Sequence, residues 1–112
     1  MCFINSPLRS YKIATKDITV YKMIKNNGEG YYYDLIIDKN KDKWKEGYHY
    51  TETDFPKIPR YIFRENGFHS SIDRPSFRYV GTKIVEMIIP KGSKYYKNTE
   101  EYFSSDLIYP HQ

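Results

Sequence analysis

The strongest strand pattern in this chain is the stretch Lys83-Ile84-Val85-Glu86-Met87-Ile88-Ile89. It is rich in β-branched residues, whose stiff side chains pack well on a pleated surface. The stretch ends at Pro90, which has no N–H to donate to a ladder. We therefore expect a strand over residues 83–89, with Glu86 facing solvent or a cleft.

Other segments carry similar strand patterns. They are Ile18 to Ile24, Tyr31 to Ile37, the pair Tyr61 to Arg64 and Phe68 to Ser71, and Tyr102 to Tyr109. The pair flanks Asn66-Gly67, which is a strong hairpin signal. We expect the last segment to pair with residues 83–89 through the connection Pro90-Lys91-Gly92-Ser93.

Helix-forming sequence is scarce. Residues 71–80 offer an N-cap at Ser71 or Asp73, a proline (Pro75) tolerated in a first turn, and Gly81 as a stop. This predicts one or two helical turns. We expect residues 38–59 to form an irregular excursion from the sheet and a loop, with a short strand at 44–50. The expected fold is α+β and mostly β, a compact antiparallel or mixed sheet with one or two short helices.

The chain length of 112 residues predicts one domain over residues 1–112. Tyrosine (13) and phenylalanine (6) supply much of the apolar surface, so the core and any binding surface will be aromatic. The net charge of +4 arises from 18 basic and 14 acidic residues that are interleaved, as in residues 38–46. A mixed-sign run is typical of a solvated face, so we do not expect nucleic-acid binding; the charge suits a small anionic ligand.

Cys2 is the only cysteine, so no intrachain disulfide can form and a reducing compartment is expected. No apolar run reaches the length of a signal segment or a membrane span, which predicts a cytoplasmic protein without membrane contact. His49 and His111 lack acidic or cysteine partners at metal-ligand spacing, so we expect no metal and no cofactor. Nothing in the sequence defines the oligomeric state.

Three polar clusters each abut an apolar run: Gly67-Phe68-His69-Ser70-Ser71, Pro90-Lys91-Gly92-Ser93 and Ser104-Ser105-Asp106-Leu107-Ile108. Such a layout places a histidine, several hydroxyls and a carboxylate around one cleft, as in many nucleotide or sugar sites. Each cluster alone is also explained as a turn or a cap. The Lys-Gly-Ser element lacks the preceding glycine of a phosphate loop and opens no helix.

Neighbouring strand residues point to opposite faces. His69 and Ser70 therefore cannot join Asp106 in a hydrolase triad, whereas His69 and Ser71 share a face. We name no catalytic residue. The candidate ligand-binding residues are His69, Ser71, Lys91, Asp106 and Lys22.

Taken in order, the elements around Lys22, His69, residues 88–93 and Asp106 resemble a pared-down ADP-ribosyltransferase-like core. In that family a first strand carries Arg or His after an aromatic residue, and a middle strand carries hydroxyls. An Ile-Pro-Lys-Gly-Ser-like turn and a late strand with the catalytic Glu follow. Here Lys22 replaces the Arg or His and lacks the planar fork of arginine. Asp106 takes the Glu position with a side chain one methylene shorter.

More of the chain is similar to small uncharacterised phage and prophage proteins. The similarity rests on the Tyr21-Lys22 strand, on residues 44–50 and on the Gly-Phe-His motif at residues 67–69. It implies a phage or mobile-element origin and no mechanism.

We therefore expect a small intracellular, phage-related protein that binds a nucleotide-type ligand, similar to NAD, ADP-ribose or a cyclic nucleotide, without catalysis. His69 and Ser71 would contact sugar hydroxyls, Lys91 a phosphate, and Asp106 a ribose or a cation. One alternative is a protein-interaction module that acts on a host or phage protein through Trp44, Tyr48 and Tyr50. A second is a degenerate ADP-ribosyltransferase.

Overall fold

The computed structural model describes residues 11–25, 44–55 and 67–111, and these form an all-β structure without a helix in the described ranges. Eight antiparallel strands lie in the order β1-β6-β7-β4-β2-β5-β8-β3. The strands are β1 (Lys12–Ile13), β2 (Ile18–Lys25), β3 (Tyr48–Thr51), β4 (Phe68–Ser71), β5 (Thr82–Ile89), β6 (Lys94–Lys97), β7 (Glu101–Ser104) and β8 (Asp106–Tyr109). The antiparallel, mostly-β part of the prediction is confirmed.

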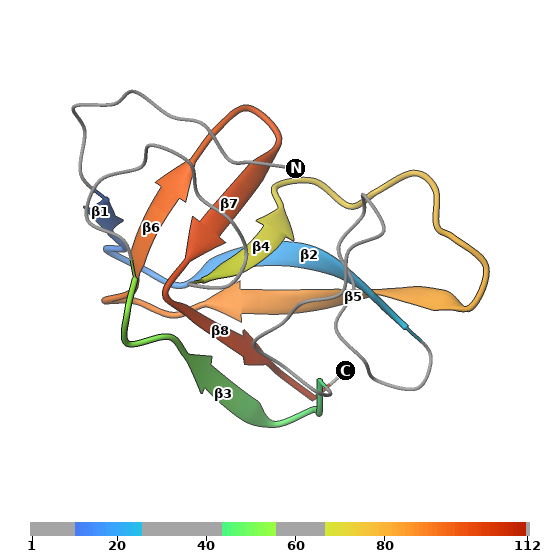
Figure 1. The fold of residues 1–112 in the computed structure, drawn as a ribbon, viewed down its shortest axis with the longest axis horizontal. Helices are drawn as coiled ribbons and strands as arrows, with labels where there is room; N and C mark the ends of the chain where they lie inside the picture. The colour runs from blue at the N-terminus through green and yellow to red at the C-terminus, as the bar shows by residue number, and fades with distance from the viewer. Residues whose placement is uncertain (1–10, 26–43, 56–66, 112) are drawn as a thin grey trace.

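The sheet curls on itself at Ser105. Strands β7 and β8 are separated by this residue alone, yet β4, β2 and β5 lie between them in the sheet order. One bent strand therefore pairs with β4 at its start and with β5 at its end, which is how chains turn corners between sheets. Figure 1 shows β4 and β7 running at a steep angle to β2 and β5, which lie below them in this view.

Hydrogen bonds satisfy the polar groups of this corner. The Ser105 N–H donates to the Lys94 carbonyl at 2.8 Å, and the Glu52 N–H donates to the Ser105 carbonyl at 2.8 Å. The Ser105 hydroxyl accepts from the Lys94 N–H at 3.0 Å and donates to the Asp106 carboxylate at 2.7 Å. A buried bend is tolerated because its backbone groups keep their partners.

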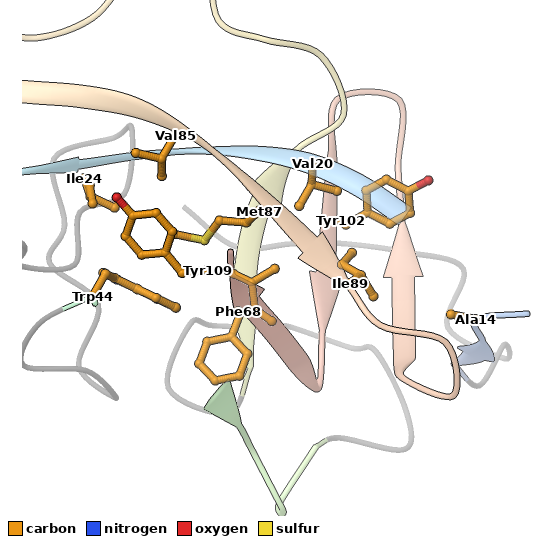
Figure 2. Packing of buried hydrophobic residues seen from close by; sticks show 11 residues of the cluster. Ala14, Val20, Ile24, Trp44, Phe68, Val85, Met87, Ile89, Tyr102 and Tyr109 are labelled. Carbon is orange, nitrogen blue, oxygen red and sulfur yellow. The ribbon is translucent and has the colours of Figure 1, made fainter. Parts of the chain in front are cut away.

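The longest ladder joins β2 and β5, which pair in register from Ile18 opposite Ile89 to Lys25 opposite Thr82. Alternate residues point into the curled sheet and form the main core, which Figure 2 shows from close by. Its buried members are Ala14, Val20, Ile24, Trp44, Phe68, Val85, Met87, Ile89, Tyr102, Leu107 and Tyr109. Burial of these large side chains supplies the main driving force for folding.

A second apolar cluster lies on the opposite face of β6 and β7. Phe55 stacks on Tyr96 with ring centroids 5.5 Å apart and on Phe103 at 5.2 Å. Tyr11 packs against this group. Burial, together with repulsion between the ionised forms of Tyr96 and Tyr11, raises the pKa of Tyr96 to about 12. Both faces of this part of the sheet are therefore covered.

The predicted strands over residues 18–24, 68–71 and 83–89 are confirmed, and Glu86 is exposed. The short strand expected within residues 44–50 is found at Tyr48–Thr51. The predictions for Tyr31 to Ile37 and Tyr61 to Arg64 lie outside the described residues. Within the residues that the structure describes, no helix is long and apolar enough to cross a membrane.

The predicted helix over residues 71–80 is wrong. Ser71 ends β4, and residues 72–81 are bends, turns and irregular backbone. Pro75 disfavours helical backbone at Arg74 and cannot donate a helical hydrogen bond itself. The segment also has to join two strands whose positions the rest of the sheet fixes, and tertiary pairing outweighs a weak helical signal.

The prediction for Tyr102 to Tyr109 is correct as to extended structure and incomplete as to pairing. The segment bends at Ser105, and only its second half lies beside β5, with Ile88 opposite Ile108. The turn after β5 leads first into β6. The sequence pattern predicts neither β6 nor β1. Both strands are short and partly polar, so their alternation is weak.

Candidate functional site

The connection from β4 to β5, residues 72–81, crosses over β2. Both strands are antiparallel to β2, so they run parallel to each other, and parallel strands of one sheet need a crossover connection. Strand β4 ends with Ser71 opposite Tyr21, and β5 starts with Thr82 opposite Lys25. We call residues 72–81 the crossover loop; it is the yellow-to-orange segment of Figure 1.

The first cleft lies between the crossover loop, the β6–β7 turn and the sheet, with a volume of about 300 Å³. Met23 and Ser71 contribute from the strands, and Thr99 and Glu100 from the turn. The loop contributes Asp73, Arg74, Pro75, Ser76 and Phe77. The cleft thus combines apolar surface with hydroxyls, two carboxylates and one guanidinium, a composition typical of small-molecule sites.

A backbone hydrogen bond joins the two walls of the first cleft, and an asparagine side chain shapes one of them. The Ile72 N–H donates to the Glu100 carbonyl at 3.0 Å, which ties the loop to the turn. The Asn98 side-chain oxygen accepts from the N–H groups of Glu100 and Glu101, each at 2.8 Å. Asn98 therefore fixes the turn as an Asx-type cap, so the cleft wall has a defined shape.

The second cleft lies next to the first and shares the loop residues Arg74, Pro75, Ser76 and Phe77 with it. Arg78, Lys83 and Ile84 complete its lining, and its volume is about 430 Å³. Met23 in the first cleft and Ile84 in the second are direct partners across β2 and β5. The two clefts therefore lie side by side on one face of the sheet.

The end of the loop is fixed before β5 begins. The Arg78 guanidinium donates to the Thr82 carbonyl at 2.7 Å, and the Thr82 N–H donates to the Tyr79 carbonyl at 3.1 Å. Gly81 adopts a φ of +81°, which favours glycine. The exposed ring of Phe77 contacts Tyr79 edge to face at 5.6 Å, so this ring has a packing partner.

A buried pair of ionisable residues lies beside the floor of the first cleft. His69 Nδ1 and a Glu101 carboxylate oxygen are 3.4 Å apart, and their side chains are 1% and 2% exposed. Glu101 is the cross-strand partner of Ser71, and the His69 ring also packs on Phe103 at 4.7 Å. A buried carboxylate is costly without a hydrogen-bonding partner, and His69 supplies one.

Of the five predicted site residues, three lie on the neighbouring strands β2 and β4, but they point to both faces of the sheet. Ser71 lines the first cleft, and His69 lies on the same strand and face but is buried. Lys22 is buried on the opposite face of the sheet, the face of the main core. Its ammonium donates to the His69 carbonyl at 2.8 Å and lies 5.3 Å from the Trp44 ring centroid. Lys22 and His69 therefore contact each other inside the protein, and only Ser71 reaches a cleft.

Lys91 and Asp106 line neither of the two clefts. Lys91 is exposed on the turn between β5 and β6, where its backbone N–H donates to the Asp17 carboxylate at 2.9 Å. The Ser93 hydroxyl donates to the Pro90 carbonyl at 2.6 Å and closes the turn. This geometry matches the interpretation of the segment as a turn.

The Asp106 carboxylate accepts hydrogen bonds from three side chains: Ser105 at 2.7 Å, His49 at 2.8 Å and Thr51 at 3.0 Å. Partial burial alone would raise its pKa. The hydrogen bonds from Ser105, His49 and Thr51, and the charge of His49, outweigh burial and lower the pKa of Asp106 below its usual value. This carboxylate therefore stabilises the pairing of β3 with β8.

One alternative from the sequence uses Trp44 as an exposed anchor for a partner protein, whereas in the structure Trp44 belongs to the main core. Its side chain is only 3% exposed, and its ring packs on Tyr50 at 4.5 Å and Phe68 at 5.7 Å. Tyr48, by contrast, is 55% exposed. The large flat indole is used in the core because the curled sheet has to fill its interior.

Sequence reasoning missed most of the first cleft, notably Arg74, Phe77 and Glu100. The segment Arg74-Pro75-Ser76-Phe77-Arg78 places an aromatic ring between two guanidinium groups. That combination suits a ligand with a ring and a negative charge. A helix over residues 71–80 would not bring these side chains together in a cleft. They line one because the connection between β4 and β5 crosses over β2.

No known protein family, curated protein or solved structure matches this chain. The similarity to an ADP-ribosyltransferase-like core and to phage proteins stays a prediction. Within residues 11–25, 44–55 and 67–111, no group of three or more His, Cys, Asp or Glu side chains is placed to hold a metal ion.

Proposed function

We propose that the first cleft binds a nucleotide-type small molecule, similar to NAD, ADP-ribose or a cyclic nucleotide, and that it does so without catalysis. The observation that carries the proposal is the presence of an exposed aromatic ring, a guanidinium and two carboxylates in the lining of one cleft of about 300 Å³. This volume is at the lower end of the range for ligand pockets.

Each group matches a part of a nucleotide. Phe77 is 54% exposed and offers a face on which a base can stack. Arg74 suits a phosphate, because a guanidinium donates two parallel hydrogen bonds. Asp73 and Glu100 can accept from sugar hydroxyls, and the Ser71 hydroxyl can donate or accept.

Binding without transfer is proposed because of the position of Asp106. In the resemblance to ADP-ribosyltransferases this residue stands for the catalytic carboxylate, and it lines neither cleft. Its oxygens already accept from Ser105, His49 and Thr51. A role on a ligand in the first cleft would require both a different location and the loss of these bonds.

The proposal is tested by thermal-shift screening of NAD, ADP-ribose and cyclic nucleotides, followed by calorimetry. A ligand at a hundred times its Kd adds about 2.7 kcal/mol to the free energy of unfolding. We expect Phe77→Ala to weaken binding by about 1–3 kcal/mol, because base stacking on an aromatic ring is lost. Tyr48→Ala is the matched control, since Tyr48 is 55% exposed and lies on β3, outside both clefts.

Unchanged melting with every ligand at millimolar concentration would refute the proposal. Equal weakening by Phe77→Ala and Tyr48→Ala would also count against it, because Tyr48 lines neither cleft. Arg74→Gln provides an independent variant: it should reduce affinity for a phosphorylated ligand by about 1.5–3 kcal/mol, the usual contribution of a hydrogen bond to a charged group.

A further inference from the structure

The charges of the two adjoining clefts differ. The first contains the carboxylates Asp73 and Glu100 together with Arg74. The lining of the second contains Arg74, Arg78 and Lys83 and no acidic residue. Arg74 belongs to both, so a ligand that extends past it leaves a mixed environment and enters a purely cationic one.

Building on the proposed function, we propose that the second cleft binds the phosphate groups of the same ligand, so that this site selects nucleotides with a pyrophosphate or longer phosphate chain over nucleosides. Arg74 would contact the phosphate nearest the sugar. Arg78 would contact the phosphate beyond it. Two guanidinium groups in a lining without a carboxylate suit the charge of a diphosphate group and disfavour a neutral ligand end.

The geometry of the sheet supports one continuous site. Met23 and Ile84, which belong to the first and second clefts, are cross-strand neighbours on β2 and β5. Residues paired in this way have Cβ atoms about 5 Å apart. A nucleotide is longer than this separation, so a single ligand can span both clefts.

The phosphate end of the site is also fixed in place. Arg78 donates to the Thr82 carbonyl at 2.7 Å, which holds the guanidinium stem against the start of β5. A guanidinium has five N–H donors, so it keeps others for a ligand. Lys83 alternates with Ile84 along β5, so its side chain belongs to the opposite face, and Arg78 is the position for a substitution. Arg78→Gln keeps an amide donor for the Thr82 carbonyl.

The test is calorimetry of the full chain with adenosine, ADP and inorganic tripolyphosphate, and with the guanine and uracil counterparts of the first two. We expect the diphosphate to bind at least tenfold more tightly than its nucleoside. Arg78→Gln should remove about tenfold of the affinity for the diphosphate and for tripolyphosphate, and leave nucleoside affinity unchanged. Lys91→Gln is the matched control, since Lys91 follows the opposite end of β5 and lines neither cleft.

The two proposals fail in different ways. If nucleosides and diphosphates of all three bases fail to bind the wild-type chain, the proposed nucleotide function is wrong. If a diphosphate binds but Arg78→Gln binds it as tightly as the wild type, or if nucleoside and diphosphate bind equally, the assignment of phosphates to the second cleft is overturned and the first cleft alone remains. Equal losses in Arg78→Gln and Lys91→Gln would indicate a general charge effect and would also overturn it.

Discussion

Gly67 allows the close approach of β4 and β7, and its replacement by alanine tests the packing beneath the candidate site. An added Cβ would lie 2.5 Å from Phe103 Cζ and 2.9 Å from each Cε atom. Non-bonded carbons are comfortable at about 3.5–4.0 Å. The Phe103 ring is fully buried, and Phe55 stacks on it at 5.2 Å, so it has little room to move.

We expect Gly67→Ala to lower the free energy of unfolding by about 1–3 kcal/mol, the usual cost of overpacking a core. In a domain of this size each kcal/mol lowers Tm by about 4 °C, so the loss is measurable by urea or thermal unfolding. The clash predicts that Phe103→Leu, although destabilising alone, rescues Gly67→Ala. The double variant should therefore be more stable than the sum of the two single effects allows, by at least about 0.5 kcal/mol.

Gly92→Ala is the matched control for this cycle. Gly92 has a φ of +92°, and a Cβ added there would meet no atom within 4 Å, so alanine is costly through backbone strain alone. Phe103→Leu should add to Gly92→Ala without any rescue. A neutral Gly67→Ala, or strict additivity of Gly67→Ala with Phe103→Leu, would refute the packing that we describe.

The remaining predictions concern stability. The pKa of Asp106 is lowered on folding from its ordinary value of 3.8, so its contribution is complete above that pH and is lost as the pH falls through the folded-state pKa. The stability difference between the wild type and Asp106→Asn, measured by urea unfolding, should therefore shrink below pH 3.8, and a pH-independent difference would contradict the three hydrogen bonds. Lys22→Met should retain about 1–3 kcal/mol more stability than Lys22→Ala, because methionine fills the space beside Trp44 that alanine leaves empty; equal losses would mean that the ammonium, and not packing, determines the effect.

The central strands could be predicted because their signal is local. Residues 18–24 and 83–89 are dense in β-branched side chains, and the structure pairs them over their whole length. The prediction that His69 and Ser71 share a face is also borne out by their registers with Phe103 and Glu101. Side-chain alternation along a strand needs no knowledge of the partner strand.

The candidate site could not be predicted in the same way. Its cleft depends on the crossover of residues 72–81, and no sequence pattern indicates that β4 and β5 both pair with β2. Ser71, Asp73 and Gly81 are good helix caps and so predict a helix, whereas Pro75 and the fixed strand ends decide otherwise. Lys91 and Asp106 join His69 in the predicted site through their order along the chain, and order along the chain does not determine neighbours in a sheet.

The sequence by itself determined that this protein is mostly β, that its interior is aromatic, and that the segment from Phe68 to Ser71 is extended. These properties depend on residue type and on a period of two, which any strand obeys. Only the tertiary structure decided that Trp44 and Lys22 are buried, that Asp106 joins β3 to β8, and that an arginine-rich loop crosses β2. These depend on which distant strands pair, and that choice is made by the packing of the whole curled sheet.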